Sequence, residues 1–172
     1  EAMLEHFRAI KENTTAGLIL YHFPGETGIE FSPEEIVSWG REGLFVAVKN
    51  TTGMEHTMEL ILENAHNPNL KISNGFDSLA LSALASGADA LINAGSNITP
   101  RQYVKIYELA KEGKYEEARR IYEEILPILL YQEKDGNTEP GLCKYCLNLQ
   151  GFDCGVPRKP VPEVSEEAKR TA

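Results

Sequence analysis

The sequence lacks a cluster of basic residues, a long apolar run and an obvious leader. Lys and Arg total 17 against 26 Asp and Glu, which gives a formal net charge of −9 at pH 7. Nucleic-acid affinity depends on clustered Lys and Arg, so we expect no nucleic-acid partner. No apolar stretch approaches the length of a membrane span and no signal-peptide pattern opens the chain, so we expect no membrane partner and a cytoplasmic location.

Cysteines are also too few for a disulfide framework. Cys143, Cys146 and Cys154 are an odd number, clustered late in the chain, as expected in a reducing compartment. Zinc requires four ligands and Cys154 is the only obvious third, so we expect no metal site. A thioredoxin-like pair would open a helix after a strand, whereas Cys143 and Cys146 lie in a helix-rich segment; buried helical cysteines are the favoured interpretation.

Apolar strand-like runs do alternate with helical patterns over residues 1–112. The spacing between strands is roughly that of one β-loop-α-loop unit and predicts a parallel sheet covered by helices. Four such units are compatible with a small doubly wound sheet or with half of an eight-stranded barrel. Expected strands cover residues 17–23, 44–48, 70–73 and 90–93, and expected helices cover residues 1–12, 54–64 and 77–85 and begin at 33 and 100.

Strand patterns end at about residue 113. Residues 113–172 are expected to form a helical extension, with helices over 115–132 and 141–149 and from 165. Capping boxes are predicted at Ser32 with Glu35 and at Thr99 with Gln102. The chain starts with Glu1 inside an amphipathic helical pattern, so we expect that residues have been lost before it.

Tyr21 and Lys49 each end a predicted strand, directly before a turn. Parallel architectures place active sites at the carboxyl ends of strands, and neighbouring strands lie about 4.8 Å apart. Alternation puts Phe45 and Ala47 on the face of Lys49. Desolvation favours the neutral amine that attacks a ketone to form a Schiff base, and a phenol can relay the protons. From these residues alone, a solvent-reaching lysine and a packed tyrosine are the commoner arrangement.

The segments around both residues resemble the signatures of one enzyme family. Tyr21-His-Phe-Pro-Gly-Glu-Thr-Gly28 is similar to Tyr-Asn-x-Pro-x-x-Thr/Ser-Gly, and Phe45-Val-Ala-Val-Lys-Asn-Thr-Thr-Gly53 to the lysine signature, of the dihydrodipicolinate synthase and N-acetylneuraminate lyase superfamily. Residues 74–80 and 87–97 resemble its last strand-loop segments, and residues 155–160 its carboxyl-terminal turn. The chain looks like the carboxyl-terminal half of a class I aldolase.

This resemblance implies a TIM (β/α)8 barrel, of which the chain supplies about strands five to eight plus the helical extension. Lys49 would carry an imine with pyruvate, without cofactor or metal, and Tyr21 would relay protons. A loop that holds the pyruvate carboxylate, and a second tyrosine from a neighbouring subunit of a dimer or tetramer, would lie in the first half. The substrate-binding residues implied are Thr51, Gly75, Asp77, Thr27, Glu26 and Ile92.

Some positions depart from the family patterns. Glu26 stands where the synthases hold the aldehyde's carboxylate with an Arg, and Ser78 stands where the lyases bind the sugar chain with a Glu. Asp77 is equally compatible with a helix N-cap, and Thr27 with a turn closure. His22 replaces the usual Asn and is predicted to pack on the face opposite Tyr21.

The leading hypothesis is therefore a Schiff-base-forming lyase or aldolase acting on pyruvate and an aldehyde, or on a 2-oxo acid. The alternatives are 4-hydroxy-tetrahydrodipicolinate synthase proper, in lysine biosynthesis, and a truncated fragment without catalytic activity. A half-barrel exposes two strand edges, so we expect the 172 residues alone to be a poor enzyme. A doubly wound binding protein ranks last, because no Gly-rich phosphate loop follows a strand.

Overall fold

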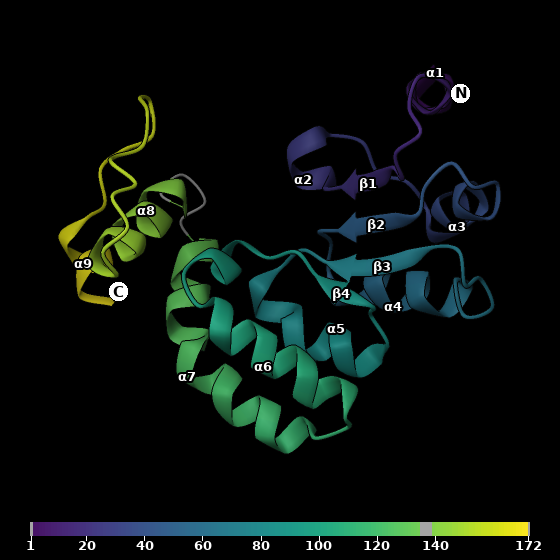
Figure 1. Cartoon of the computed structure of the whole chain (residues 1–172). Helices are drawn as coiled ribbons and strands as arrows, with labels where there is room; N and C mark the ends of the chain where they lie inside the picture. The colour runs from purple at the N-terminus through teal and green to yellow at the C-terminus, as the bar shows by residue number, and fades with distance from the viewer. Residues whose placement is uncertain (1, 135–138, 172) are drawn as a thin grey trace. The chain divides into compact units, whose positions relative to one another are not determined.

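The computed structural model describes residues 2–134 and 139–171 (Figure 1). These residues divide into two compact units, one of residues 2–75 and 86–92 and the other of residues 76–85 and 93–171 apart from the gap. The strands are β1 (Ile19–His22), β2 (Ala47–Asn50), β3 (Lys71–Asn74) and β4 (Ala90–Leu91). The helices are α1 (Ala2–Glu12), α2 (Pro24–Thr27), α3 (Pro33–Arg41), α4 (Met54–Glu63), α5 (Ala80–Ser86), α6 (Pro100–Lys111), α7 (Tyr115–Lys134), α8 (Glu139–Leu149) and α9 (Glu166–Thr171), with 3-10 turns η1 (Asp77–Leu79) and η2 (Ala94–Asn97).

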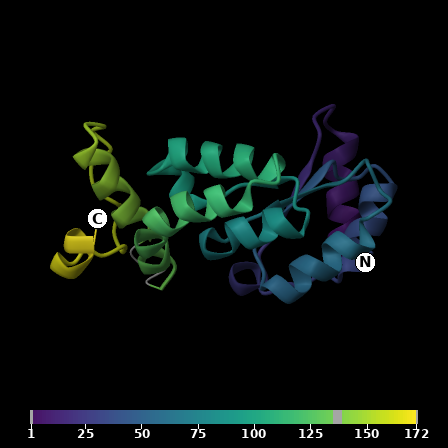
Figure 2. The same cartoon turned by 90° about the horizontal axis from the view of Figure 1, so that it is seen from below.

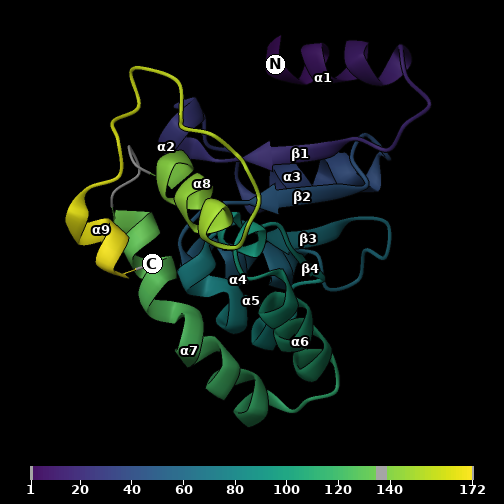
Figure 3. The ribbon, with the colours of Figure 1, turned by 60° about the vertical axis from the view of Figure 1, so that its left-hand side comes forward.

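The four described strands form one parallel sheet in the order β1-β2-β3-β4 (Figure 3). Each strand is followed by helix, because parallel neighbours require a crossover connection. The α/β class and the parallel sheet predicted from the sequence are confirmed. The register aligns Tyr21 with Lys49 and Lys49 with Ser73 across the sheet.

One face of the sheet is packed against α3 and α4. Leu20, Val48 and Ile72 point into a core that also contains Ile36 of α3 and Leu60 of α4. On the other face Ile19 and Tyr21 remain about half exposed, at 54% and 50%. Parallel sheets are normally buried on both faces, so the face that carries Tyr21 is the one left for a further layer or a ligand.

Phe45 does not lie on the face of Lys49, and that prediction was wrong. Its side chain is 3% exposed and packs edge-on against Phe7, with ring centroids 5.3 Å apart, and near Trp39 at 6.3 Å. The reason is that β2 begins only at Ala47, so strict alternation does not extend back to Phe45. The aromatic ring joins the helix-side core instead.

The two predicted helix caps had different outcomes. At α3, Ser32 and Glu35 form the expected capping box: the Ser32 N–H donates to Glu35 Oε2 at 2.9 Å and the Glu35 N–H donates to Ser32 Oγ at 3.3 Å. At α6 the predicted box is wrong, because Thr99 makes no side-chain cap. Its hydroxyl donates to the Gly95 carbonyl at 3.1 Å, a partner from the preceding turn.

The second unit is helical, as expected for the end of the chain. Helices α6 and α7 lie side by side (Figures 1 and 2). Cys146 of α8 is buried with Leu142, Ile98 and Ala168 in a small core, and burial raises the pKa of the Cys146 thiol. Cys143 and Cys154 are half-buried, and the three cysteines are thiols that are not joined in disulfides. The predicted boundary between residues 112 and 113 stays a prediction.

No described helix is both long and apolar enough to cross a membrane.

Candidate active site

Tyr21 and Lys49 come together on the open face of the sheet. They are register partners at the ends of β1 and β2, and Lys49 Nζ lies 4.2 Å from the centroid of the Tyr21 ring. The ring face attracts an ammonium group, so the contact favours a position of the amine beside the aromatic side chain. Lys49 is half-buried while Tyr21 is half exposed, which leaves the pair accessible to a small molecule.

Backbone pairing continues beyond the strands at the same edge. The Thr51 N–H donates to the His22 carbonyl at 2.8 Å, the Gly75 N–H to the Asn50 carbonyl at 2.9 Å, and the Ile92 N–H to the Asn74 carbonyl at 3.0 Å. Thr51, Gly75 and Ile92, which the sequence predicted around the substrate, therefore follow consecutive strands at the carboxyl edge. That edge is where parallel sheets place their ligands.

Thr51 carries a buried polar atom that lacks a partner. The residue is 5% exposed, and its hydroxyl oxygen has no hydrogen-bond partner among the described residues. A side chain at Gly75 would run into this hydroxyl and would come within 3.3 Å of the Asn50 carbonyl. Glycine is thus required at position 75 by the close approach of Thr51. An unpaired buried hydroxyl is costly, so Thr51 is the polar group here that a ligand could satisfy.

Glu26 and Thr27 lie on α2, the single helical turn that directly follows β1. The Thr27 hydroxyl donates to the Phe23 carbonyl at 3.0 Å, and Gly28 ends the turn with φ of 68°. Thr27 therefore closes the turn, the structural alternative considered for it. Glu26 is exposed, so its carboxylate contributes negative charge on the segment next to Tyr21.

Asp77 belongs to the second unit and is 3% exposed. Both of its carboxylate oxygens accept from the Gly95 N–H at 3.1 Å, one also accepts from the Tyr103 hydroxyl, and its carbonyl accepts from the Tyr122 hydroxyl at 2.7 Å. The N-cap interpretation is wrong, because Phe76 occupies the N-cap of η1. Asp77 thus connects η1 by hydrogen bonds to η2, α6 and α7. A role of Asp77 in substrate binding stays a prediction.

His22 lies behind the candidate site, on the helix-facing side predicted for it. It is 1% exposed; its Nδ1 is 2.9 Å from Asn50 Oδ1, and its Nε2 accepts from the Phe31 N–H at 3.1 Å. Asn50 in turn donates to the hydroxyls of Thr52 at 2.8 Å and Thr57 at 3.0 Å. Burial is the main cause that lowers the pKa of His22 below its ordinary value. The sequence predicted the packing of His22 but not these polar partners.

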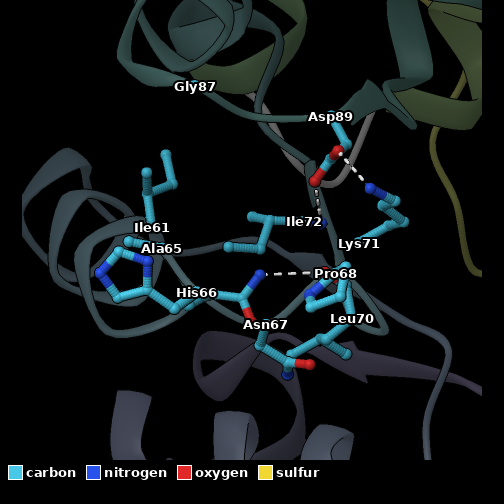
Figure 4. Close-up of a pocket in the computed structure, with 11 residues that line it drawn as sticks. Ile61, Ala65, His66, Asn67, Pro68, Leu70, Lys71, Ile72, Gly87 and Asp89 are labelled. Atoms are coloured by element: carbon cyan, nitrogen blue, oxygen red, sulfur yellow. Dashed lines mark hydrogen bonds and ion pairs between the residues drawn. The ribbon is translucent and has the colours of Figure 1, made fainter.

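Two cavities flank the first unit's sheet. One, of about 370 Å³, is largely apolar and is lined by Tyr21, Thr27, Ile19, Phe7 and Met3, between α1 and β1. The other, of about 430 Å³, lies at the amino edge of β3 and β4 (Figure 4).

Polar contacts hold the cavity at the amino edge together. The Asp89 carboxylate accepts a hydrogen bond from the Ile72 N–H at 2.9 Å and forms an ion pair with Lys71 Nζ at 3.2 Å (Figure 4). The Asn64 side chain donates to the Leu70 carbonyl at 2.9 Å. In barrel folds the amino edge serves stability and the carboxyl edge serves catalysis. The larger cavity is therefore not the candidate active site. In the described part of the chain, no group of three or more His, Cys, Asp or Glu is placed to hold a metal.

Comparison with known proteins identifies relatives of the whole chain. The sequence model of the Dihydrodipicolinate synthetase family matches residues 1–172. The chain is 32% identical over 167 residues to a 4-hydroxy-tetrahydrodipicolinate synthase of Oceanobacillus iheyensis, a match that covers 97% of this chain and 56% of that protein. The chain thus spans little more than half the length of the curated relatives that it matches.

Solved structures share the fold. A dihydrodipicolinate synthase from Aquifex aeolicus superposes with a TM-score of 0.86 at 26% identity, covering 96% of this chain and 56% of that one. CdNal from Clostridium difficile, solved in complex with mannosamine, gives a TM-score of 0.81 at 25% identity, covering 97% and 56%. The fold therefore matches part of the TIM-barrel structures of such synthases; which strands the chain supplies stays a prediction.

Acid should destabilise the protein through His22. Its folded pKa is lowered, whereas an unfolded histidine titrates near pH ~6.5. Between these two values the unfolded state binds more protons, so stability should fall as the pH drops below about 6.5 and should not depend on this group above it. Urea unfolding midpoints from pH 8 to pH 5 measure the effect.

The matched control for this acid effect is the exposed His66. The variant His22→Asn should lose the part of the pH dependence that belongs to His22, and His66→Asn should keep it. Identical pH profiles for the two variants would show that His22 does not titrate differently on folding.

A second prediction concerns the contact of Gly75 with Thr51. The variant Gly75→Ala should lower the free energy of unfolding by about 1–3 kcal/mol, the usual cost of overpacking, because the new methyl group meets the Thr51 hydroxyl. In a Thr51→Ala background the same change should cost less, since the hydroxyl is gone. Urea denaturation of both single variants and the double variant measures this coupling; strictly additive losses would contradict it.

Proposed function

Because the chain belongs to the dihydrodipicolinate synthetase family, whose enzymes act through a lysine Schiff base, we propose that Lys49 is the residue that bonds covalently to pyruvate. The proposed reaction is aldol condensation of pyruvate with an aldehyde, or the reverse cleavage of a 2-oxo acid. The observation that carries the proposal is the contact between Lys49 Nζ and the Tyr21 ring, 4.2 Å from its centroid, on the open face of the sheet. Since the chain spans 56% of a relative's length, the activity is proposed for the full-length protein.

The chemistry follows from an amine next to a phenol. The neutral Lys49 amine attacks the keto carbon of pyruvate, and the carbinolamine oxygen takes up a proton and leaves as water. Loss of a methyl proton from the imine gives an enamine, which attacks the aldehyde carbon; the new alkoxide is protonated and water releases the product. Tyr21 is the proposed donor and acceptor of these protons. Its 50% exposure leaves the hydroxyl free to meet substrate oxygens.

Charge and hydrogen bonding near the site bear on the aldehyde partner. Glu26 contributes an exposed carboxylate on α2, which disfavours an aldehyde with its own carboxylate. The Thr51 hydroxyl needs a partner, which favours a hydroxylated aldehyde. We therefore propose an uncharged hydroxylated aldehyde, with Gly75 and Ile92 at the same edge as further substrate-binding candidates. For Asp77, a role in substrate binding is proposed from the resemblance alone.

A second candidate is the synthase activity itself. It is favoured by the 32% identity to a 4-hydroxy-tetrahydrodipicolinate synthase over 97% of the chain. The two candidates differ in the charge of the aldehyde and share the imine on Lys49. An oligomer in which another subunit completes the site is proposed for both.

The imine can be trapped. Incubation of the full-length protein with pyruvate and borohydride should add one reduced pyruvyl group to Lys49, located by mass spectrometry of the peptides. Lys49→Ala should abolish the adduct and lower kcat by at least about 10³-fold, because no other nucleophile replaces the amine. Lys71→Ala removes an exposed lysine at the start of β3, which pairs with Asp89. This control variant should leave the adduct intact. A folded protein without an adduct would exclude the mechanism.

The proposed role of Glu26 predicts a change of specificity. Glu26→Arg should raise kcat/KM for a short aldehyde bearing a carboxylate by about tenfold, which corresponds to ~1.4 kcal/mol, and should not improve an uncharged hydroxylated aldehyde. Glu12→Arg makes the same charge change at the end of α1, so it serves as the control for net charge. Equal effects of the two variants would remove Glu26 from the specificity argument.

A further inference from the structure

We propose that His22 is a positioning residue for the Schiff-base chemistry, because its imidazole acts through Asn50 to fix the strand ends that carry Tyr21 and Lys49. The inference rests on the proposed function of Lys49. His22 and Asn50 touch no substrate on the face described above. They are 1% and 0% exposed and lie on the opposite side of the sheet.

The strand register links His22 and Asn50 to the pair of Tyr21 and Lys49. His22 and Asn50 each follow one residue after Tyr21 and Lys49, and both pairs are partners across β1 and β2. Side chains alternate between faces, so a slip of one residue would set Tyr21 opposite Asn50, or His22 opposite Lys49, and carry polar groups to the wrong side. The 2.9 Å contact between the His22 and Asn50 side chains opposes that slip. The same contact therefore keeps the amine beside the phenol.

The hydrogen bonds around His22 all run in one direction. The chain of bonds starts at the Phe31 N–H, which can only donate, and ends at the Gly53 carbonyl, which can only accept. His22 Nε2 must accept from Phe31, so Nδ1 carries the proton and donates to Asn50 Oδ1. The amide of Asn50 then donates to the hydroxyls of Thr52 and Thr57.

Both threonine hydroxyls donate hydrogen bonds to the Gly53 carbonyl. Thr57 donates to the Gly53 carbonyl at 3.1 Å and Thr52 at 3.4 Å. Gly53 lies in the loop that leaves Lys49 and is the N-cap of α4. The imidazole therefore links the loop before α3 to the loop after β2, and every bond between them has a single orientation. The working state of His22 is the neutral ring with its proton on Nδ1.

The charged and titratable groups that face His22 are His56 and Glu30. The His56 ring lies 4.9 Å from the His22 ring, and its Nε2 is 3.0 Å from the Phe31 carbonyl. Glu30 acts through its charge from the neighbouring loop. A proton on His22 Nε2 would set donor against donor at the Phe31 N–H and place a charge in a buried site beside the His56 ring, so protonation pushes the imidazole away from Asn50. Loss of rate in acid is the expected consequence.

Two substitutions separate the two bonds of the imidazole. His22→Asn, the conservative variant, keeps a donor near the position of Nδ1 and loses the acceptor for Phe31. His22→Gln keeps an acceptor near the position of Nε2 and loses the donor to Asn50. In the full-length protein at pH 8, His22→Gln should lower kcat by about 10- to 100-fold, the range expected for misplaced reacting groups, with the KM for pyruvate little changed. His22→Asn should retain most of the wild-type kcat.

The acid limb of the kcat–pH profile is the readout that a purely structural role would not move. The wild-type rate should fall below neutral pH, and this inflection should be absent in His22→Asn. Thr57→Val, which keeps the shape of a buried side chain and removes the acceptor for Asn50, should lower kcat in the same direction as His22→Gln. This variant tests the idea even where His22→Gln does not fold.

The outcomes are distinguishable. Equal losses in His22→Asn and His22→Gln, wild-type rates in Thr57→Val, or an unchanged acid limb in His22→Asn would overturn the positioning role. A borohydride adduct on Lys49 in the slow variants would show that the nucleophile is intact and only its placement has suffered. Absence of the adduct in the wild type would instead reject the proposed function.

Discussion

The register of β1 against β2 determines where the polar groups at the carboxyl ends of these two strands lie. With Tyr21 opposite Lys49, the amine meets the aromatic ring on the open face, and His22 meets Asn50 on the packed face. The next residue, Thr51, then finds its backbone partner in His22. One alignment of two short strands thus sets the candidate nucleophile, its phenol and the loop beside them.

The packed face makes that alignment stable. Leu20, Val48 and Ile72 are buried against α3 and α4, so changing the register would expose apolar surface as well as break polar bonds. The polar row of His22 and Asn50 lies at the end of the same face, next to the loops. Apolar burial and the hydrogen bonds therefore favour the same alignment.

Much of this arrangement could be predicted from the sequence. Apolar runs that end at Tyr21 and Lys49 predicted two neighbouring strands with their functional groups at one edge, because strand order and crossover follow general rules. The alternation of side chains along a strand predicted that His22 would point away from Tyr21. The same rule was wrong for Phe45, since it holds only within a strand and β2 starts at Ala47.

Tertiary partners explain what local patterns missed. Thr99 has a side chain that often caps helices, but its hydroxyl donates a hydrogen bond to the Gly95 carbonyl. The Asp77 carboxylate accepts hydrogen bonds from Gly95 and Tyr103, which belong to other elements. The orientation of the His22 ring depends on Phe31, nine residues further along the chain. No spacing rule encodes such contacts, because they exist only once the loops have packed.

The brevity of the link between β1 and α2 has a mechanical consequence. Only Phe23 separates the last residue of the strand, His22, from the first residue of the helical turn, Pro24. A segment so short, and held at one side by the sheet, has little freedom to swing across the open face. The Tyr21 side chain is thus carried by a rigid part of the fold, so its place beside Lys49 does not depend on the closing of a loop.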